Sequence, residues 1–208
     1  MRTKLVASLA AATVGAFLVV GCSDNSTDSP MDGHSMGSTS SAPMSSAQAS
    51  TSAQFNDADV TFAQMMYPHH AQAVEMDAIA NGRTDNPEVL SLASAIEAAQ
   101  QPEMDQLTAW LAQWGQPAPS ADMGEMSGMD HSADSGMMTQ QDMDALMAAT
   151  GPEFDRQWLT MMIAHHTGAI EMANTEIVDG SNPDAQEMAR TIVSTQQQEI
   201  ETMQRLLG

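Results

Sequence analysis

Four stretches of the chain place apolar residues three and four positions apart, which is the pattern of amphipathic helices. These stretches cover residues 57–81, 87–114 and 152–179, and a last one that runs from 183 nearly to the C-terminus. Residues 116–138 lose this periodicity. The pattern therefore predicts four long helices, with a break of irregular chain after the second.

Residues typical of helix ends stand where the periodicity begins or stops. Asn86-Pro87 and Asn182-Pro183 each supply an N-cap followed by a proline at the first helical position. Asn56 or Asp57 is the expected N-cap of the first helix. Residues 139–149 form a further short predicted helix before the third long one.

The two halves of the chain repeat each other at an offset of 96 residues. MMYPHHAQAVEM at 65–76 lies over MMIAHHTGAIEM at 161–172, with seven of twelve positions identical. The same ungapped offset places Gln100 on Gln196 and Glu103 on Glu199. Each half is a predicted helical hairpin, and two such hairpins pack most simply as an antiparallel four-helix bundle.

The N-terminus has the features of an export signal. Arg2 and Lys4 precede an apolar run that ends in Val19-Val20-Gly21-Cys22, after which the chain turns polar. This end resembles a bacterial lipobox, which implies cleavage before Cys22 and lipidation of that cysteine. A plain signal peptide and an uncleaved anchor are the alternatives. The expected location is the extracytoplasmic face of the cell membrane.

These features predict three regions. Residues 1–21 are the signal peptide, and residues 22–55, rich in Ser, Ala, Thr, Gly and Asp, are a disordered lipid-anchored tether. Residues 56–208 are one folded domain, made of repeat one at 56–115, a Met-rich linker with the short helix at 116–150, and repeat two at 151–208.

The net charge of the chain limits the kinds of partner that it can bind. The formal net charge is −21, and loss of the two positive charges of Arg2 and Lys4 with the signal takes it to −23. Nucleic acid is excluded as a partner by this charge, and membrane attachment has to rest on acyl chains. Cations are enriched around such a surface.

The candidate chemistry lies along the repeated motifs. The chain has 20 methionines and one cysteine, Cys22, so a metal site must use His, Met and carboxylates. Positions three and four apart form one inward seam on each motif helix. The predicted ligands are Met66, His69, Met76, Met162, His165 and Met172 on these seams, and His70 and His166 at their flanks.

The second helix of each hairpin adds a glutamate in a predicted inward seam, which in the first hairpin is Leu92, Ile96, Ala99, Glu103, Gln106 and Trp110. A carboxylate buried without a partner costs several kcal/mol. Glu103 and Glu199 are therefore expected to pair with the imidazoles or to share a metal with them. Met65 and Met161 are further possible ligands or supporting residues.

Thioether and imidazole donors without thiolate select copper, above all Cu(I), with Ag(I) as its mimic. The linker repeats these donors in Met123, Met126, Met129 and His131, an auxiliary set that resembles the Met-rich motifs of bacterial copper-resistance proteins. None of the six histidines has a glutamate three residues before it, as a ferritin-like di-iron centre requires.

The pattern D-x-x-[FW]-x-x-M-M-x-x-H-H-x-x-A, followed by Q-x-x-E on the next helix, resembles the DUF305 family over residues 57–208. The resemblance implies a ferritin-like, all-α four-helix fold, copper or silver binding, and sequestration as the role. One departure is Pro68, where the second copy has Ala164; an interior proline is expected to kink the first helix.

The leading hypothesis is a copper-binding protein without turnover, acting in sequestration, resistance or shuttling. One alternative is a ferritin-like metal-dependent oxidase that uses the same His and Glu cluster. Another is a metal-free helical interaction module, in which the inward methionines only fill the core. A copper-transfer partner and a homo-oligomer are both compatible with the sequence.

Overall fold

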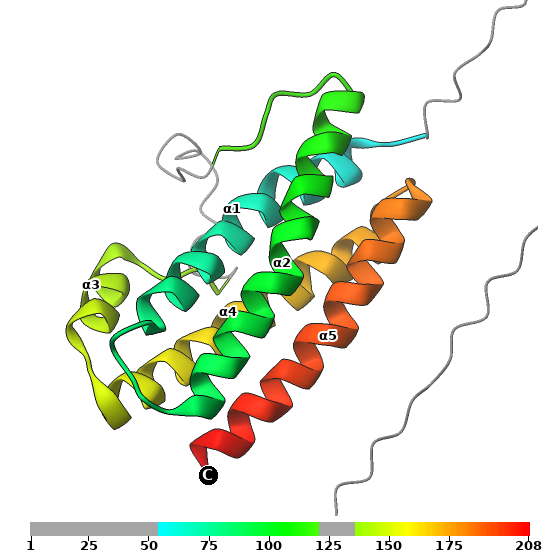
Figure 1. The fold of residues 1–208 in the computed structure, drawn as a ribbon. Coiled ribbons are helices and arrows are strands. Elements are labelled where there is room, and N and C mark those ends of the chain that lie inside the picture. Colours follow the sequence, from blue (N-terminus) through cyan, green and yellow to red (C-terminus); the bar gives the residue numbers. More distant parts are fainter. Residues whose placement is uncertain (1–53, 121–135) are drawn as a thin grey trace, which may run out of the picture. The chain divides into compact units, whose positions relative to one another are not determined.

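The computed structural model describes residues 54–120 and 136–208. This part of the chain forms five helices and no strand (Figure 1). They are α1 Asp57–Ala80, α2 Pro87–Gln113, α3 Gln140–Ala148, α4 Gly151–Asp179 and α5 Pro183–Leu207. The predicted helices and their order are confirmed.

The four long helices form an antiparallel bundle of two hairpins. Within each hairpin the helices pack along their length, α1 against α2 and α4 against α5, and α1 also packs against α4. The short α3 lies against α1 and α4 (Figure 1). The motif-bearing helices α1 and α4 therefore face each other, as the repeat predicts.

The predicted asparagine caps begin three of the helices. The Asn56 side chain accepts hydrogen bonds from the backbone N–H groups of Ala58 and Asp59. Asn86 caps α2 and Asn182 caps α5 in the same way, each followed by proline. These bonds satisfy N–H groups that have no partner inside the helix. Helix α1 continues through Pro68, which is buried.

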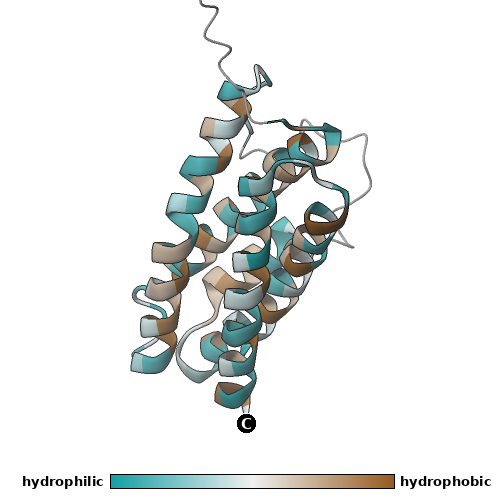
Figure 2. Cartoon of the chain, turned by 90° about the vertical axis from the view of Figure 1, so that its right-hand side faces the viewer, coloured by the Kyte–Doolittle hydropathy of each residue, from teal (hydrophilic) through white to brown (hydrophobic). Residues whose placement is uncertain are grey.

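The core consists of two apolar clusters with a polar layer between them. The first contains Met76, Ile96, Phe154, Trp158 and Met162. The second contains Phe62, Met66, Leu107, Trp110 and Ile192. In Figure 2 the hydrophobic positions of the long helices recur between hydrophilic ones along each helix. Burial of these clusters stabilises the bundle above and below the residues that separate them.

The chain that follows the linker returns beside the centre of α1 and α4. Gln72 of α1 donates to the backbone carbonyl of Met138 at 2.9 Å and accepts from its backbone N–H at 2.7 Å. A side chain at Gly136 would overlap the backbone carbonyl oxygen of Ala164, and its φ of +73° also favours glycine. These contacts position the start of α3.

Among the described residues no helix is long and apolar enough to span a bilayer. The predicted signal peptide, Cys22 and most of the tether lie outside these residues. So do Met123, Met126, Met129 and His131 of the linker.

Asp59 joins the start of α1 to the turn between α4 and α5. Its carboxylate accepts from the backbone N–H of Asn182 at 2.9 Å, from the backbone N–H and hydroxyl of Ser181, and from the backbone N–H of Asn56. Burial opposes the charge, but these hydrogen bonds lower the pKa of Asp59 below its usual value. The hydrogen bonds hold the two hairpins together at this end.

Glu176 lies next to Asp59 and is 1% exposed. Burial, together with the neighbouring Asp59 carboxylate, raises the pKa of Glu176 to about 8. Glu176 is therefore protonated in the folded protein at neutral pH, whereas it is ionised in the unfolded chain.

We expect the free energy of unfolding to carry a contribution from Glu176 that falls as the pH rises from about 4.5 to about 8, because the folded state holds this proton more tightly than the unfolded state does. Glu176→Gln, which mimics the neutral acid, removes that fall. Urea unfolding at several pH values measures the difference between this variant and the parent. Glu171→Gln, on the exposed face of α4, is the control and should leave the pH dependence unchanged. Parallel pH profiles for the parent and Glu176→Gln would contradict the assignment.

Candidate metal centre

Four histidines form a buried layer across the middle of the bundle. His69 and His70 come from α1, His165 and His166 from α4, and none is more than 1% exposed. The ring centroids of His69 and His165 are 3.7 Å apart, with an angle of 37° between the rings. The predicted meeting of the two inward histidines is confirmed.

The two flanking histidines pair with the two predicted glutamates. His70 Nε2 lies 2.7 Å from Glu103 Oε2, and His166 Nε2 lies 2.8 Å from Glu199 Oε2. Each pair closes inside one hairpin, between α1 and α2 or between α4 and α5. The predicted pairing of glutamate with imidazole is confirmed.

These pairs determine where the imidazole lone pair points. An ionised carboxylate only accepts hydrogen bonds, so Nε2 of His70 and of His166 carries the proton. Their Nδ1 atoms then hold the lone pairs, and both Nδ1 atoms are buried without a hydrogen-bond partner. This is the arrangement in which a carboxylate fixes a histidine as a metal ligand.

His165 remains neutral at neutral pH. Burial lowers the pKa of His165 well below its usual value, and the neighbouring His69, His166 and His70 lower it further. Within the described residues, neither ring nitrogen of His165 is in hydrogen-bonding geometry with a partner. A buried neutral imidazole with an unpartnered lone pair is suited to a metal ion, because the ion replaces the missing hydrogen bond.

The methionines predicted as ligands occupy three different places. Met66 and Met162 are fully buried three residues before the inward histidines, one on each side of the layer. Met76 is fully buried in the first apolar cluster, seven residues and about 10 Å along the helix from His69. Met172 is half-buried and lines a cavity together with Met65. Met161 is 9% exposed at the edge of the first cluster.

The structure corrects the phase of the predicted seam on α2. Gln106, expected inside, is exposed, whereas Gln100 is 2% exposed and takes part in the polar layer. Its repeat partner Gln196 is 3% exposed on α5. The Q-x-x-E spacing was the available signal, because each glutamine lies one turn before the glutamate that pairs with histidine.

The sequence analysis missed Asp77, which is 3% exposed on α1. Burial raises its pKa to about 9, with Glu97 and Glu199 adding to the shift, so Asp77 is neutral at neutral pH. Neither of its oxygens has a hydrogen-bond partner within the protein. The repeat places Ala173 at the corresponding position of α4, which makes the two halves unequal at this point.

Within residues 54–120 and 136–208, no three His, Cys, Asp or Glu side chains are arranged to hold a metal ion together. A hard or zinc-like site needs three or more such donors. The layer instead offers buried imidazoles, with buried thioethers on either side. This donor set suits a soft ion.

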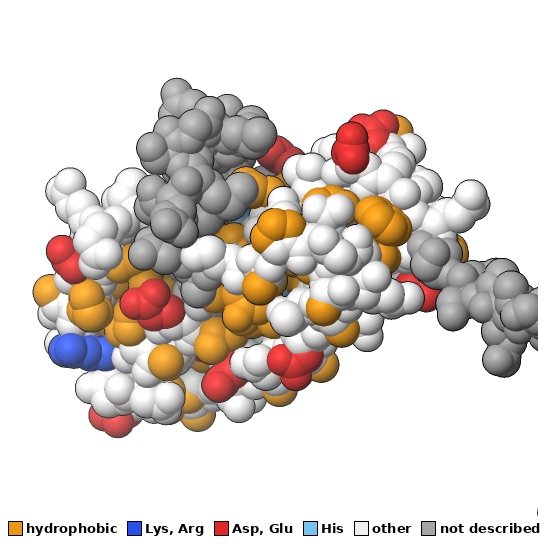
Figure 3. Space-filling view, turned by 90° about the horizontal axis from the view of Figure 1, so that it is seen from above, with side chains coloured by type: hydrophobic (Ala, Val, Ile, Leu, Met, Phe, Trp, Pro, Cys, Tyr) orange, Lys and Arg blue, Asp and Glu red, His pale blue; other side chains and the backbone are white. Residues whose placement is uncertain are grey.

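The charge of the described surface also favours cations. Its only basic residues, apart from histidine, are Arg83, Arg156, Arg190 and Arg205. Figure 3 shows Asp and Glu side chains distributed over one face of the molecule, among apolar ones. A negative potential attracts cations to the protein and repels anions.

No curated protein matches the chain. A DUF305 fragment from Deinococcus radiodurans has a similar structure, with a TM-score of 0.66 and 35% identity over 74% of this chain and 97% of that one. The putative secreted protein DUF305 from Streptomyces coelicolor has a TM-score of 0.64 and 34% identity, over 72% of this chain and 91% of that one. CopM in its Cu(II)-bound form has a TM-score of 0.61 and 30% identity, over 72% of this chain and 95% of that one.

CopM also has similar structures in Cu(I)-bound and Ag-bound forms, with TM-scores of 0.58 and 0.57. The family model described as domain of unknown function (DUF305) matches residues 59–207, which include both hairpins and the entire histidine layer. The chain belongs to the DUF305 family.

Proposed function

We propose that this protein is a lipid-anchored copper-binding protein, with Cu(I) as its preferred ion and Ag(I) as a mimic. The observation that carries the proposal is the buried layer of four histidines, with the buried thioethers of Met66 and Met162 on either side. Within the described residues, the ring nitrogens of His165 and the Nδ1 atoms of His70 and His166 have no hydrogen-bond partner. The copper-bound and silver-bound forms of CopM, a protein of similar fold, support it.

Each group in the layer has a distinct part in this proposal. His165 supplies lone pairs from the centre of the layer, and Nδ1 of His70 and Nδ1 of His166 supply them at two separate positions on its flanks. Glu103 and Glu199 fix the proton on the opposite nitrogen of His70 and of His166. Met66 and Met162 add soft donors from either side. Because burial keeps His165 neutral before binding, the ion does not have to displace a proton from this imidazole.

The role we propose is sequestration or shuttling, without turnover. The layer is enclosed by the four long helices, and each of its histidines is no more than 1% exposed. An oxidase needs dioxygen and successive ions to reach the metal, whereas storage gains from a buried site that releases its ion slowly. A metal-free interaction module would not explain why, among the described residues, the ring nitrogens of His165 are buried without a hydrogen bond.

We also propose that Cys22 carries the lipid and holds the protein on the extracytoplasmic face of the membrane. The support is the sequence Val-Val-Gly-Cys after an apolar run, in a chain with no other cysteine. The strong negative charge favours an acyl anchor over electrostatic adsorption to anionic lipid.

His69→Leu combined with His165→Leu should remove tight Cu(I) binding in the bundle. Leucine fills the space of each imidazole and leaves no buried polar atom, so the helices are expected to remain folded, which circular dichroism checks. Binding is measured by anaerobic competition with a chromogenic Cu(I) chelator. Ile96→Leu combined with Ile192→Leu, in the two apolar clusters, is the control and should bind Cu(I) as the parent does. An unchanged Cu(I) stoichiometry in the double leucine variant would place the tight site elsewhere.

The same protein in air distinguishes binding from turnover. A binding protein holds Cu(I) up to its binding stoichiometry and does not accelerate oxidation of the remainder, so dioxygen is consumed no faster than in a protein-free control. Catalytic oxidation by the histidine layer would consume Cu(I) in many-fold molar excess over the parent protein. The double leucine variant would lack this activity.

Glu103→Gln and Glu199→Gln should each weaken Cu(I) binding by about 10- to 100-fold, because the amide no longer fixes the imidazole tautomer. The competition assay measures this. Glu201→Gln lies two residues beyond Glu199 on the exposed face of α5 and should bind as the parent does. Equal affinities in all three variants would remove the glutamates from the site.

Cys22→Ala should abolish lipid attachment in a bacterial host that processes lipoproteins. Incorporation of labelled palmitate and partition into detergent measure the attachment. Unlabelled parent protein recovered from the aqueous phase would contradict the anchor and leave the proposal of metal binding untouched.

A further inference from the structure

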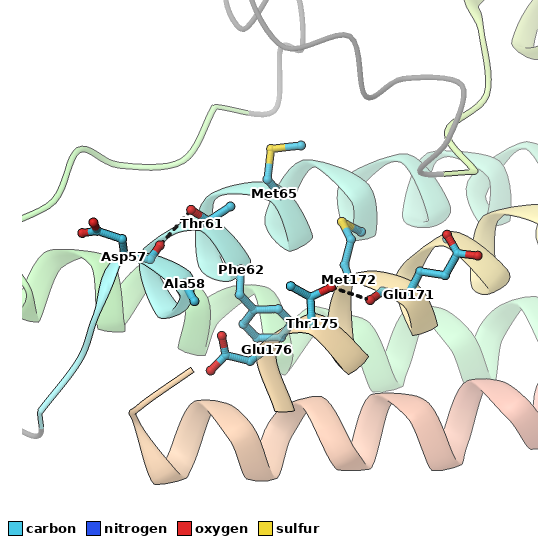
Figure 4. Close-up of a pocket in the computed structure, with 10 residues that line it drawn as sticks. Asp57, Ala58, Thr61, Phe62, Met65, Glu171, Met172, Thr175 and Glu176 are labelled. Atoms are coloured by element: carbon cyan, nitrogen blue, oxygen red, sulfur yellow. Dashed lines mark hydrogen bonds between the residues drawn. The ribbon is translucent and has the colours of Figure 1, made fainter. Parts of the chain in front are cut away.

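A cavity of about 440 Å³ lies between the first half of α1 and the second half of α4 (Figure 4). Ten residues line it, five from each helix, and its walls are largely apolar, with Phe62 and Gly168 among them. The volume is within the range of small-ligand sites. The cavity lies outside the histidine layer and takes no part in the site described above.

Two thioethers from opposite helices reach this cavity. Met65 comes from α1 and Met172 from α4, and both side chains are half-buried (Figure 4). Half-burial leaves the sulfur atoms accessible from solvent while the apolar wall removes part of the surrounding water. Thioether sulfur is a weak ligand for hard ions and a good one for soft monovalent ions.

The charges around the cavity favour a cation. Asp57 and Glu171 are exposed residues of its lining, and neither Lys nor Arg is among the ten residues. Glu176 also belongs to the lining but is neutral at neutral pH, because burial raises its pKa to about 8. The cavity therefore combines negative charge near the solvent with thioether and apolar groups on its walls, which attracts cations and retains soft ones.

The lining of the cavity comes within about one helical turn of the histidines along each motif helix. Met65 precedes His69 by four residues on α1, and Gly168 follows His165 by three residues on α4. These separations correspond to about 6 Å and 4.5 Å along the helix axes. At Gly168 the missing side chain leaves room between α1 and α4, because the glycine forms part of the lining.

We infer that Met65 and Met172 form a separate loading site for a soft monovalent cation, from which the ion passes to the buried histidines. The inference rests on the proposed function and adds its route of entry. A buried layer enclosed by four helices needs a place where the ion loses its water before it enters. The cavity supplies thioethers for this exchange at the surface, one helical turn from the nearest histidine. The transfer exchanges ligands only and leaves the charge of the ion unchanged.

The direct test follows methionine methyl resonances by NMR during titration with Ag(I), in protein labelled with [methyl-¹³C]methionine. Met65→Leu and Met172→Leu identify the two resonances. We expect both resonances to shift together, in the parent and also in the His69→Leu, His165→Leu double variant. Met188, a half-buried methionine of α5 outside the cavity, is the control and should not shift with them.

The second test measures how fast Ag(I) reaches the histidines, from the imidazole resonances after rapid mixing. The Met65→Leu, Met172→Leu double variant should load more slowly than the parent, because it keeps the charges around the cavity but has no thioether there to replace the water bound to the ion. Its final stoichiometry at the histidines should be unchanged. Met188→Leu should load at the parent rate.

The outcomes separate this inference from the proposed function. If Ag(I) shifts the imidazole resonances but leaves those of Met65 and Met172 unchanged, the loading site is wrong and the histidine site stands. If the two methionines bind Ag(I) but their replacement leaves the loading rate unchanged, the route is wrong. If Ag(I) moves the two methionine resonances and no imidazole, the proposed function is wrong, together with the transfer step.

Discussion

The presence of four imidazoles in the middle of a helical bundle is the constraint on which the rest of this structure depends. A charged imidazole there would lack both water and a nearby compensating charge, so burial keeps His165 neutral. Glu103 and Glu199 lie 18% and 13% exposed at the flanks, where water still reaches the carboxylates. The apolar clusters on either side supply the burial that offsets this polar layer.

In the two sites that we propose, the protein would separate two tasks that a single metal site cannot combine. A site that retains an ion has to be enclosed and rigid, and the histidine layer is enclosed by four long helices with their own apolar clusters. A site that accepts ions from solvent has to be accessible, and the half-buried methionines of the cavity have that property. The α1–α4 interface holds both because its two motif helices are antiparallel, which places Met172 near the start of α1.

The fold and half of the site follow from the sequence, because both depend on repetition and on helical period. The hairpins, the caps and the pairing of Glu103 with His70 all follow from positions three, four and seven residues apart. The rest depends on helix rotation, which the period alone does not determine: on α2 a small rotation exchanges Gln106 for Gln100 inside the bundle. Asp77 was missed because a single acidic residue on a helix is normally solvated, and its burial results from packing against two other helices.

Each glutamate–histidine pair joins residues 33 apart within one hairpin, whereas the stacked imidazoles come from different hairpins. A single hairpin therefore contains every residue of its glutamate–histidine pair and lacks only the imidazole that opposes its inward histidine. A second copy of the same hairpin would provide that imidazole. In such a self-paired ancestor every substitution would appear on both sides of the symmetry axis. Fusion of two copies into one chain removes that restriction. Asp77 in one half can then correspond to Ala173 in the other, where a symmetric pair would have had to bury two carboxyl groups.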